Sequence, residues 1–487
     1  MVCPHGMRRD MRARFEFQAS IHDRTFGRLF PRNPVTKPLD KQQAVALLDR
    51  LAGRMRDPNP ADGPADAGQT FLGQFIDHDV TLDASSRLAR RGGSFEVANQ
   101  RTPTLDLDCV FGGGAEPDPQ LYSQRHHGYL YVGREDQCED LPRNHEGVAL
   151  IGDPRNDENA FVAAVQSTFH RFYNILLRRI EHDVDGFRAH LRVEERPEQA
   201  AQRLTRWHYQ HIVLTDFLPS FVAPDTLERV MAILNRGALP KGFRPSESFI
   251  PAEFSVAAYR FGHATVRSEY DIGSRVAKLF ANAEGDGGLP AFGDKAEVVD
   301  LARFFGAPGD PGRAQKARPV APRIAAELFD LPFVENEDVI GDVRVPADQA
   351  RSLAHRNIMR DRFTFELASG QSAAAALGFT PLDRDDATRE AGLEKIPLWY
   401  YCLQEAAEQG EGRLGEVGGT IVAAVLGRLL RDDPASVWRQ RPWTSPLAVN
   451  GHFTMGVMVD FVRSAWKEVN FADELRTPKR QADPVPA

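Results

Sequence analysis

A run of apolar residues at helical spacing constrains the fold of this chain more than any other feature. The run follows Asn159 and repeats every three or four positions. Its members are Phe161, Val165, Phe169, Phe172, Leu176 and Ile180. Because residues three and four apart share one side of a helix, this spacing predicts a long amphipathic helix from Asn159 onward.

Similar but shorter patterns predict further helices along the chain. The expected segments are residues 41–55, 198–218, 251–268, 298–305, 348–367 and 419–430. Proline and glycine clusters separate them, and the alternation typical of strands is scarce. The sequence therefore predicts a mainly α fold, a single large helical domain with long loops and little β-structure. We expect residues 1–40 to form an irregular N-terminal arm and residues 41–487 to form the domain.

Composition narrows the class of protein. The 487 residues carry a net charge of -8, with 42% hydrophobic and 26% charged residues, which is ordinary for a soluble globular protein and disfavours a general nucleic-acid binder. No apolar stretch is long enough for a membrane span, and the N-terminus has no signal-peptide core. The four cysteines are scattered, so a cytoplasmic protein is expected, with export by another route left open. The sequence carries no signal for an oligomeric state.

The stretch GQFIDHD, residues 73–79, places polar groups in a segment whose apolar residues predict a buried helix. Gln74 and His78 share one face of that helix, and Asp77 lies close to it. Asp79 turns further away. Buried carboxylates are costly unless they are paired or bound to a metal. A single buried histidine is usually a satisfied core residue and zinc-ligand spacing is absent, so this helix alone leaves structural and functional interpretations open.

The segment RTPTLDLDCVFGGG, residues 101–114, alternates oxygen-bearing side chains. They are Thr102, Thr104, Asp106 and Asp108. Alternation places them on one side of an extended segment, where hard oxygen ligands suit calcium, and Asp79 would add a further carboxylate. The EF-hand glycine and glutamate are missing. A solvated polar edge before a glycine turn explains the pattern equally well.

The segment GDPRNDENAF, residues 152–161, brings Arg155 and Glu158 together where a loop becomes a helix. Asn156 or Asp157 is expected to cap that helix. A cluster of surface salt bridges is the ordinary explanation of such a helix start.

Two segments in the second half of the chain combine an arginine with another polar residue. In AYRFGHATVRSEY, residues 258–270, His263 follows a mid-helix glycine, and Arg260 lies nearly one turn earlier. A glycine at position 262 costs helix stability, so close approach by a flat or bulky group would justify it. Asn357 and Arg360 stand three positions apart amid apolar residues.

Together these five segments resemble the animal-type haem peroxidases, the peroxidase-cyclooxygenase superfamily, and occur in that family's order from about residue 70 to 430. GQFIDHD is similar to the family's distal-histidine motif, RFGH to its proximal-histidine motif and LDLDCVFGGG to its calcium loop. The resemblance implies an all-α haem-peroxidase catalytic domain over residues 41–487, with haem b and Ca2+ as cofactors. The implied partners are hydrogen peroxide and a small-molecule electron donor.

The resemblance assigns roles on both sides of the haem. His263 would be the axial ligand of the haem iron, and Asn357 would accept its other ring N–H. The propionates would be held by Arg260 and Arg360. On the opposite side, His78 would move a proton between the oxygens of hydrogen peroxide.

The resemblance completes the distal side with two further residues. Arg155 would stabilise the charge on the departing oxygen, and Gln74 would hold the distal water or anion. Peroxidase turnover would pass through a ferryl intermediate, with iodide, bromide, thiocyanate or phenolic and other organic molecules as donors.

The resemblance also implies two ways of fixing the haem site. Asp77 and Glu158 match carboxylates that form ester bonds to haem methyl groups in this family. Asn159 stands where a family member has a methionine that makes a third link, so that link is expected to be absent. The implied calcium ligands are Asp79, Thr102, Thr104, Asp106 and Asp108.

Two other functions stay open. The cyclooxygenase branch has a radical-forming tyrosine three residues before the proximal histidine, where this chain has Arg260. Tyr259 lies one residue earlier, so a haem-dependent dioxygenase of fatty acids or of a biosynthetic intermediate is an alternative. A non-catalytic haem-binding sensor is a second alternative, which the presence of both His78 and Arg155 disfavours. The remaining histidines, among them His170, are expected to be structural or exposed.

Overall fold

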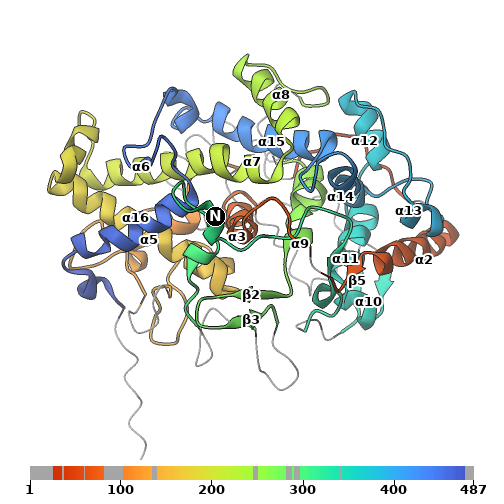
Figure 1. Cartoon of the computed structure of the whole chain (residues 1–487), viewed down its shortest axis with the longest axis horizontal. Coiled ribbons are helices and arrows are strands. Elements are labelled where there is room, and N and C mark those ends of the chain that lie inside the picture. The colour runs from red at the N-terminus through yellow and green to blue at the C-terminus, as the bar shows by residue number, and fades with distance from the viewer. Residues whose placement is uncertain are drawn as a thin grey trace, which may run out of the picture.

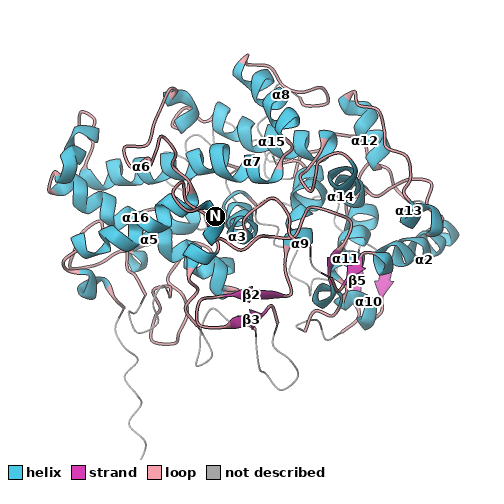
Figure 2. Cartoon of the chain, viewed as in Figure 1, coloured by secondary structure: helices cyan, strands magenta, loops and turns pink. Residues whose placement is uncertain are grey.

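Helices account for nearly all of the regular structure in the computed structural model (Figure 2). It describes residues 26–35, 38–59, 61–81, 103–133, 140–244, 250–280, 288–289, 297–332, 334, 336–340 and 343–477. Within these ranges the strands are short and occur in pairs. They are β1 (Arg56–Asp57) with β4 (Ile324–Ala325), β2 (Glu269–Asp271) with β3 (Val276–Lys278), and β5 (Asp338–Ile340) with β6 (Val343–Val345). The prediction of a mainly α fold with little β-structure is confirmed.

The α-helices follow one another along the whole described chain (Figure 1). They are α2 (Pro38–Arg54), α3 (Ala67–Val80), α4 (Asp108–Phe111), α5 (Ala160–Glu181), α6 (Pro197–Ile212), α7 (Leu218–Phe221), α8 (Pro224–Asn235), α9 (Gly262–Thr265), α10 (Ala347–Arg351), α11 (Leu353–Met359), α12 (Gly370–Leu377), α13 (Asp386–Glu390), α14 (Leu398–Glu408), α15 (Glu416–Asp432) and α16 (Met455–Ala465). The long helix expected after Asn159 is α5. In the described part of the chain, no helix has the length and apolar character needed to cross a membrane.

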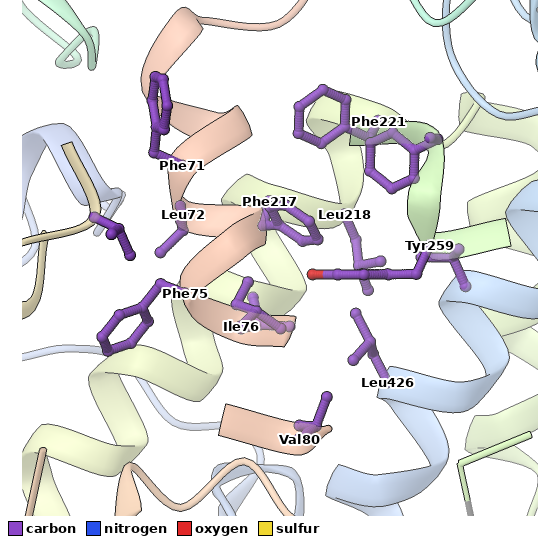
Figure 3. Packing of buried hydrophobic residues seen from close by; sticks show 14 of the residues in the cluster. Phe71, Leu72, Phe75, Ile76, Val80, Phe217, Leu218, Phe221, Tyr259 and Leu426 are labelled. Atoms are coloured by element: carbon purple, nitrogen blue, oxygen red, sulfur yellow. The ribbon is translucent and has the colours of Figure 1, made fainter. Parts of the chain in front are cut away.

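Helix α3 runs through the middle of the molecule and packs against both α5 and α9 (Figure 1). Every residue of α3 is buried except Gln74 and Asp77, which keep partial contact with solvent. Phe75 stacks on Phe169 of α5 with ring centroids 5.0 Å apart. The remaining sides of α3 are covered by apolar residues of other elements, as Figure 3 shows for Phe217 and its neighbours. The helix is thus closed on all sides but one.

Two predicted helices near the candidate site are broken. Residues 251–268 form a π-helical turn (Glu253–Ala257), a 3-10 turn (Ala258–Phe261) and α9. Residues 348–367 divide into α10, α11 and a second π-helical turn (Arg360–Thr364). Such π turns occur frequently at functional sites. Both breaks fall beside residues for which the sequence predicts haem contacts.

The helix predicted over residues 298–305 is wrong. This segment holds only a 3-10 turn, Leu301–Arg303. Asp300 caps the turn, because its side chain accepts from Ala302 N. The segment predicted over 198–218 does form, as α6 followed by a π-helical turn (Val213–Phe217) and the start of α7.

The described end of the predicted N-terminal arm, residues 26–35, lies against the domain. Leu29 N and Phe30 N donate to the buried carboxylate of Glu253 at 3.0 and 3.1 Å, and Gly27 pairs with Pro251. This end of the arm is therefore anchored to the segment that leads to His263. Residues 1–25 lie outside the described residues.

Candidate active site

His263 lies in the first turn of α9, beside the side-chain amide of Asn357 on α11. Asn357 Nδ2 is 2.7 Å from His263 Nδ1. A half-turn of the amide presents Oδ1 at the same place, where it can accept an Nδ1–H and leave the lone pair on Nε2. Burial, followed by the nearby charges of Arg260 and Arg360, lowers the pKa of His263 to about 3. The ring is therefore neutral, the state that metal ligation requires.

The surroundings of His263 leave room for a flat group. A Cβ at Gly262 would meet no atom of the described residues within 4 Å. Gly262 and His263 are both partly exposed, although the residues on either side of them are buried. Trp399 Nε1 donates to the carbonyl of Arg260 at 3.1 Å and holds this turn in place. A neutral imidazole is a donor that suits haem iron, and the open space at Gly262, the first residue of α9, allows the close approach of a flat group.

His78 lies in the last turn of α3 and is buried. Its Nδ1 is 2.7 Å from Asn156 Oδ1. An amide oxygen can only accept, so Nδ1 carries the proton and Nε2 carries the lone pair. Burial, followed by the charge of Arg155, lowers the pKa of His78 to about 4. Nε2 makes no hydrogen bond to any described residue, so His78 can serve as a neutral base.

Arg155 lies in a 3-10 turn, Pro154–Asp157, next to the end of α3. Its Nε and Nη2 pair with the two carboxylate oxygens of Asp153 at 3.1 and 2.7 Å. Nη2 also donates to the backbone oxygens of His78 and Thr81, at 3.0 and 2.7 Å. Nη1 makes no hydrogen bond to the residues that the structure describes. The guanidinium is therefore fixed in position with one nitrogen left for an oxygen of a substrate.

The expected helix cap is wrong. Asp153 caps the 3-10 turn by accepting from Arg155 N, and Asn159 caps α5 by accepting from the first N–H groups of that helix. Neither Asn156 nor Asp157 caps, because the 3-10 turn separates the loop from α5 and delays the start of the helix to Ala160.

The two partly exposed residues of α3 meet polar partners. Gln74 Nε2 donates to Glu158 Oε2 at 3.1 Å, and Asn159 Nδ2 donates to Gln74 Oε1 at 3.3 Å. Thr81 Oγ1 donates to Asp77 Oδ1 at 2.8 Å. Desolvation by neighbouring groups raises the pKa of the Glu158 carboxyl, although the side chain keeps contact with solvent. Gln74 thus joins α3 to Glu158 and Asn159 at the start of α5.

Two hydrogen bonds join α3 to the segment that carries His263. Thr70 Oγ1 and Thr265 Oγ1 lie 2.8 Å apart. Tyr259 OH donates to Gly73 O at 3.2 Å, and Figure 3 shows the Tyr259 hydroxyl directed toward α3. The predicted distal and proximal residues therefore lie on adjacent, directly bonded elements.

Asp79, Asp106 and Asp108 form a cluster of buried carboxylates. One oxygen of each lies within 4.8 Å of the others. Three carboxylates at this distance repel one another when charged, and a cation bound between them would offset that repulsion. Thr104 Oγ1 donates to Asp106 Oδ2 at 2.8 Å. Thr102 lies outside the described residues. The donor set suits a hard cation such as calcium.

The extended geometry predicted for the aspartate segment is wrong. Leu107 adopts a left-handed backbone conformation with φ 59°, and Asp108 begins the short helix α4. The chain bends at Leu107, and this bend brings Asp106 and Asp108 to the same side as Asp79.

Three buried residues behind His78 were not predicted as members of the site. They are Asn156, Gln166 and His170. The only sequence signal for two of them is a polar stripe within the apolar helix α5, where Gln166 and His170 stand four positions apart.

A family model and several solved structures are similar to this chain. Residues 84–285 match the family model "Animal haem peroxidase". The matched range contains Arg155, Glu158 and His263, and it begins just after GQFIDHD. No curated protein matches the chain. Residues 84–285 are therefore similar to an animal haem peroxidase domain, which supports a haem enzyme. Haem is the cofactor that this domain implies.

Solved structures share the fold at low sequence identity. Peroxidase A of Dictyostelium discoideum is 14% identical over 89% of this chain and 93% of its own, with a TM-score of 0.55. A fatty acid alpha-dioxygenase of Oryza sativa is 15% identical over 93% of this chain and 82% of its own, with a TM-score of 0.54. The Arabidopsis thaliana fatty acid alpha-dioxygenase is 13% identical over 99% and 81%, with a TM-score of 0.52. These likenesses establish the fold.

Proposed function

We propose that this chain is a haem-dependent peroxidase that reduces hydrogen peroxide. Its donors would be small anions such as iodide, bromide and thiocyanate, or phenolic and other organic molecules. One observation carries the proposal: the 2.7 Å contact from His78 Nδ1 to Asn156 Oδ1. It leaves Nε2 as a neutral base close to the fixed guanidinium of Arg155. A protein that only held haem would need the residues around His263 and neither of these groups.

The proposed haem binds on the His263 side. His263 would ligate the iron, and Asn357 would accept its Nδ1–H, which raises the basicity of the ligand. Arg260 and Arg360 would pair with the two propionates. When bound, haem supplies the iron that exchanges electrons with peroxide and with the donor.

The residues at the end of α3 handle the protons of hydrogen peroxide. His78 Nε2 would accept a proton from one oxygen of hydrogen peroxide and pass it to the other, which would leave as water when the O–O bond breaks with electrons that bound haem supplies. Arg155 Nη1 donates to that departing oxygen while Nε and Nη2 stay bound, so no reorganisation is needed during the reaction. Gln74, on the same face of α3 as His78, would hold the incoming water or anion.

Asp77 and Glu158 extend the proposal to a covalently bound haem. Asp77 lies on the side of α3 that keeps contact with solvent, and Glu158 lies between the 3-10 turn and α5 and is exposed. Each would form an ester bond to a haem methyl group. If so, haem stays with the protein in acidic acetone, and the double variant Asp77→Ala with Glu158→Ala releases it.

Calcium is the proposed occupant of the aspartate cluster. Asp79, Asp106 and Asp108 would supply carboxylate oxygens, with Thr102 and Thr104 completing the set. The support is the close approach of three buried carboxylates, which a divalent cation with oxygen ligands would neutralise. Because Asp79 follows His78 directly, the ion would also fix the end of α3.

An absorption experiment tests the proposed peroxidase. The haem-loaded protein is mixed with stoichiometric hydrogen peroxide, and iodide or guaiacol is then added. We expect the absorption spectrum to change when peroxide is added and to return to its initial form when the donor is added. His78→Gln should slow the first change by about a hundredfold or more while haem binding persists, which is the usual size of a general-base contribution.

His145→Gln is the matched control, because the His145 side chain is 84% exposed and lies beside Glu146 rather than a residue of the site. It should behave as wild type. A wild-type spectrum indifferent to peroxide would contradict the proposal and favour a haem sensor.

A fatty acid dioxygenase is the second candidate. Two structural neighbours are fatty acid alpha-dioxygenases, and Tyr259 lies close to His263 in sequence. Formation of a hydroperoxide from palmitic acid and oxygen, without added hydrogen peroxide, would support this candidate over the first.

A further inference from the structure

A continuous series of hydrogen bonds runs from His78 into the core. His78 Nδ1 contacts Asn156 Oδ1 at 2.7 Å, and Asn156 Nδ2 donates to Gln166 Oε1 at 2.8 Å. Gln166 Nε2 lies 2.9 Å from His170 Nε2, and His170 Nδ1 lies 3.1 Å from Tyr131 O. The three middle side chains have no exposed surface. We call Asn156, Gln166 and His170 the buried relay.

Two backbone carbonyls fix the direction of the relay. Tyr131 O can only accept, so His170 Nδ1 donates to it. Burial lowers the pKa of His170 to about 4, so its ring is neutral and its Nε2 can only accept. Gln166 Nε2 therefore donates to His170. Its other hydrogen goes to the second carbonyl, Cys109 O, at 3.0 Å.

The orientation of Gln166 in turn fixes the Asn156 amide and the protonated nitrogen of His78. Both amide hydrogens of Gln166 are used, so its Oε1 faces Asn156 and accepts from Nδ2. Asn156 must then present Oδ1 to His78, and only an Nδ1–H satisfies it. Turning the Asn156 amide around would oppose its Oδ1 to Gln166 Oε1, and turning the Gln166 amide around would oppose its Oε1 to Cys109 O. Each change would bury two acceptors against each other, which costs free energy.

We propose that Asn156, Gln166 and His170 are positioning residues that hold His78 in the tautomer with its proton on Nδ1 and its lone pair on Nε2. The consequence for turnover rests on the proposed peroxidase function, whereas the tautomer itself does not. The relay ends on a backbone carbonyl, which cannot pass a proton on. It therefore orients the base and does not conduct protons.

Nitrogen chemical shifts test the tautomer directly. Histidine labelled with 15N is incorporated, and long-range 1H–15N correlations are recorded on the haem-loaded protein in its diamagnetic ferrous carbon monoxide form. The signals missing in His78→Gln identify His78. We expect a protonated Nδ1 and an unprotonated Nε2. A wild-type His78 protonated at Nε2 overturns the inference.

A pair of variants of nearly equal volume tests the effect on the reaction. Asn156→Asp keeps an oxygen that accepts from His78, whereas Asn156→Leu removes it, and both lose the donor to Gln166. The rate constant for hydrogen peroxide should fall about tenfold or more in Asn156→Leu, because part of a general-base contribution is lost. Asn156→Asp should stay closer to wild type, and the leucine variant should show mixed tautomers.

The outcomes separate the two proposals. Equal losses of the rate constant for hydrogen peroxide in both variants would mean that Asn156 has only a structural role. That result would overturn the proposed positioning of His78. If Asn156→Leu does not fold, the 1H–15N spectrum of the wild type still tests the tautomer of His78. A wild type with the expected tautomer but no reaction with peroxide would contradict the proposed function and leave the relay standing.

Discussion

Replacing Tyr259 with phenylalanine distinguishes the two candidate chemistries. The hydroxyl donates to Gly73 O at 3.2 Å inside the core, and the ring stacks on Phe254 with centroids 4.6 Å apart. Phenylalanine keeps that stacking and loses only the hydrogen bond. Gly73 O still accepts within α3, as in any helix turn, so the carbonyl is not left without a partner. The free energy of unfolding should therefore fall by only about 1 kcal/mol, the net value of one hydrogen bond.

The assay combines equilibrium urea unfolding with the peroxide reaction. If the chain is a peroxidase, Tyr259→Phe should change the rate constant for hydrogen peroxide by no more than about twofold, because the hydroxyl takes no part in the transition state. Tyr270→Phe is the matched control, since Tyr270 is also buried and its hydroxyl accepts from Arg267 N at 2.8 Å. A loss of about a hundredfold or more in substrate oxidation for Tyr259→Phe, absent from the control, would mean that Tyr259 carries a radical, and it would refute our reasoning.

Three further predictions concern the cofactor and the metal. Because burial holds the pKa of His263 near 3, protonation competes with haem only as the pH falls toward that value. A spectrophotometric haem titration of the apoprotein should give the same affinity at about pH 8 and pH 5, whereas a pKa of 6.5 would weaken it about thirtyfold at pH 5. Removal of calcium by a chelator should lower the melting temperature, and Asp108→Asn should abolish that response; a melt indifferent to chelation would exclude the cation. Asn357→Leu should lower the iron–imidazole stretching frequency in resonance Raman spectra and Asn357→Asp should raise it, since a stronger acceptor makes the imidazole more basic; identical frequencies would contradict the assigned contact.

Burial alone did not decide which helices were predictable from the sequence. The expected segments after Asn159 and at 419–430 became α5 and α15, although α15 is buried from Val417 to Leu430. Helix α14 was missed, because the aromatic run at its start, Trp399–Tyr401, sets no helical period. Apolar spacing also cannot distinguish an α-helix from one interrupted by a π-helical turn, which is why the breaks before His263 and at Arg360 were not anticipated.

The candidate site was predictable where a motif lies within one segment. GQFIDHD holds both Gln74 and His78, and the structure keeps them on α3. The aspartate cluster was expected from alternation, but it forms through the left-handed Leu107, a conformation that nothing in a leucine signals. The buried relay joins a turn to the interior of α5, so no local pattern could reveal that Asn156 meets Gln166.

The hydrogen bonds between α3 and the His263 segment bear on when the enzyme acquires its cofactor. Thr70 and Thr265 are 195 positions apart, and Gly73 and Tyr259 are 186 apart. Contacts between such distant positions form late, because a long loop must close first. During synthesis on the ribosome, His78 emerges long before His263, and Asn357 emerges later still. Under the proposed roles, a nascent chain that ends before His263 lacks the iron ligand, and one that ends before Asn357 lacks the partner of that ligand. The complete haem site would therefore form only after most of the polypeptide has been made.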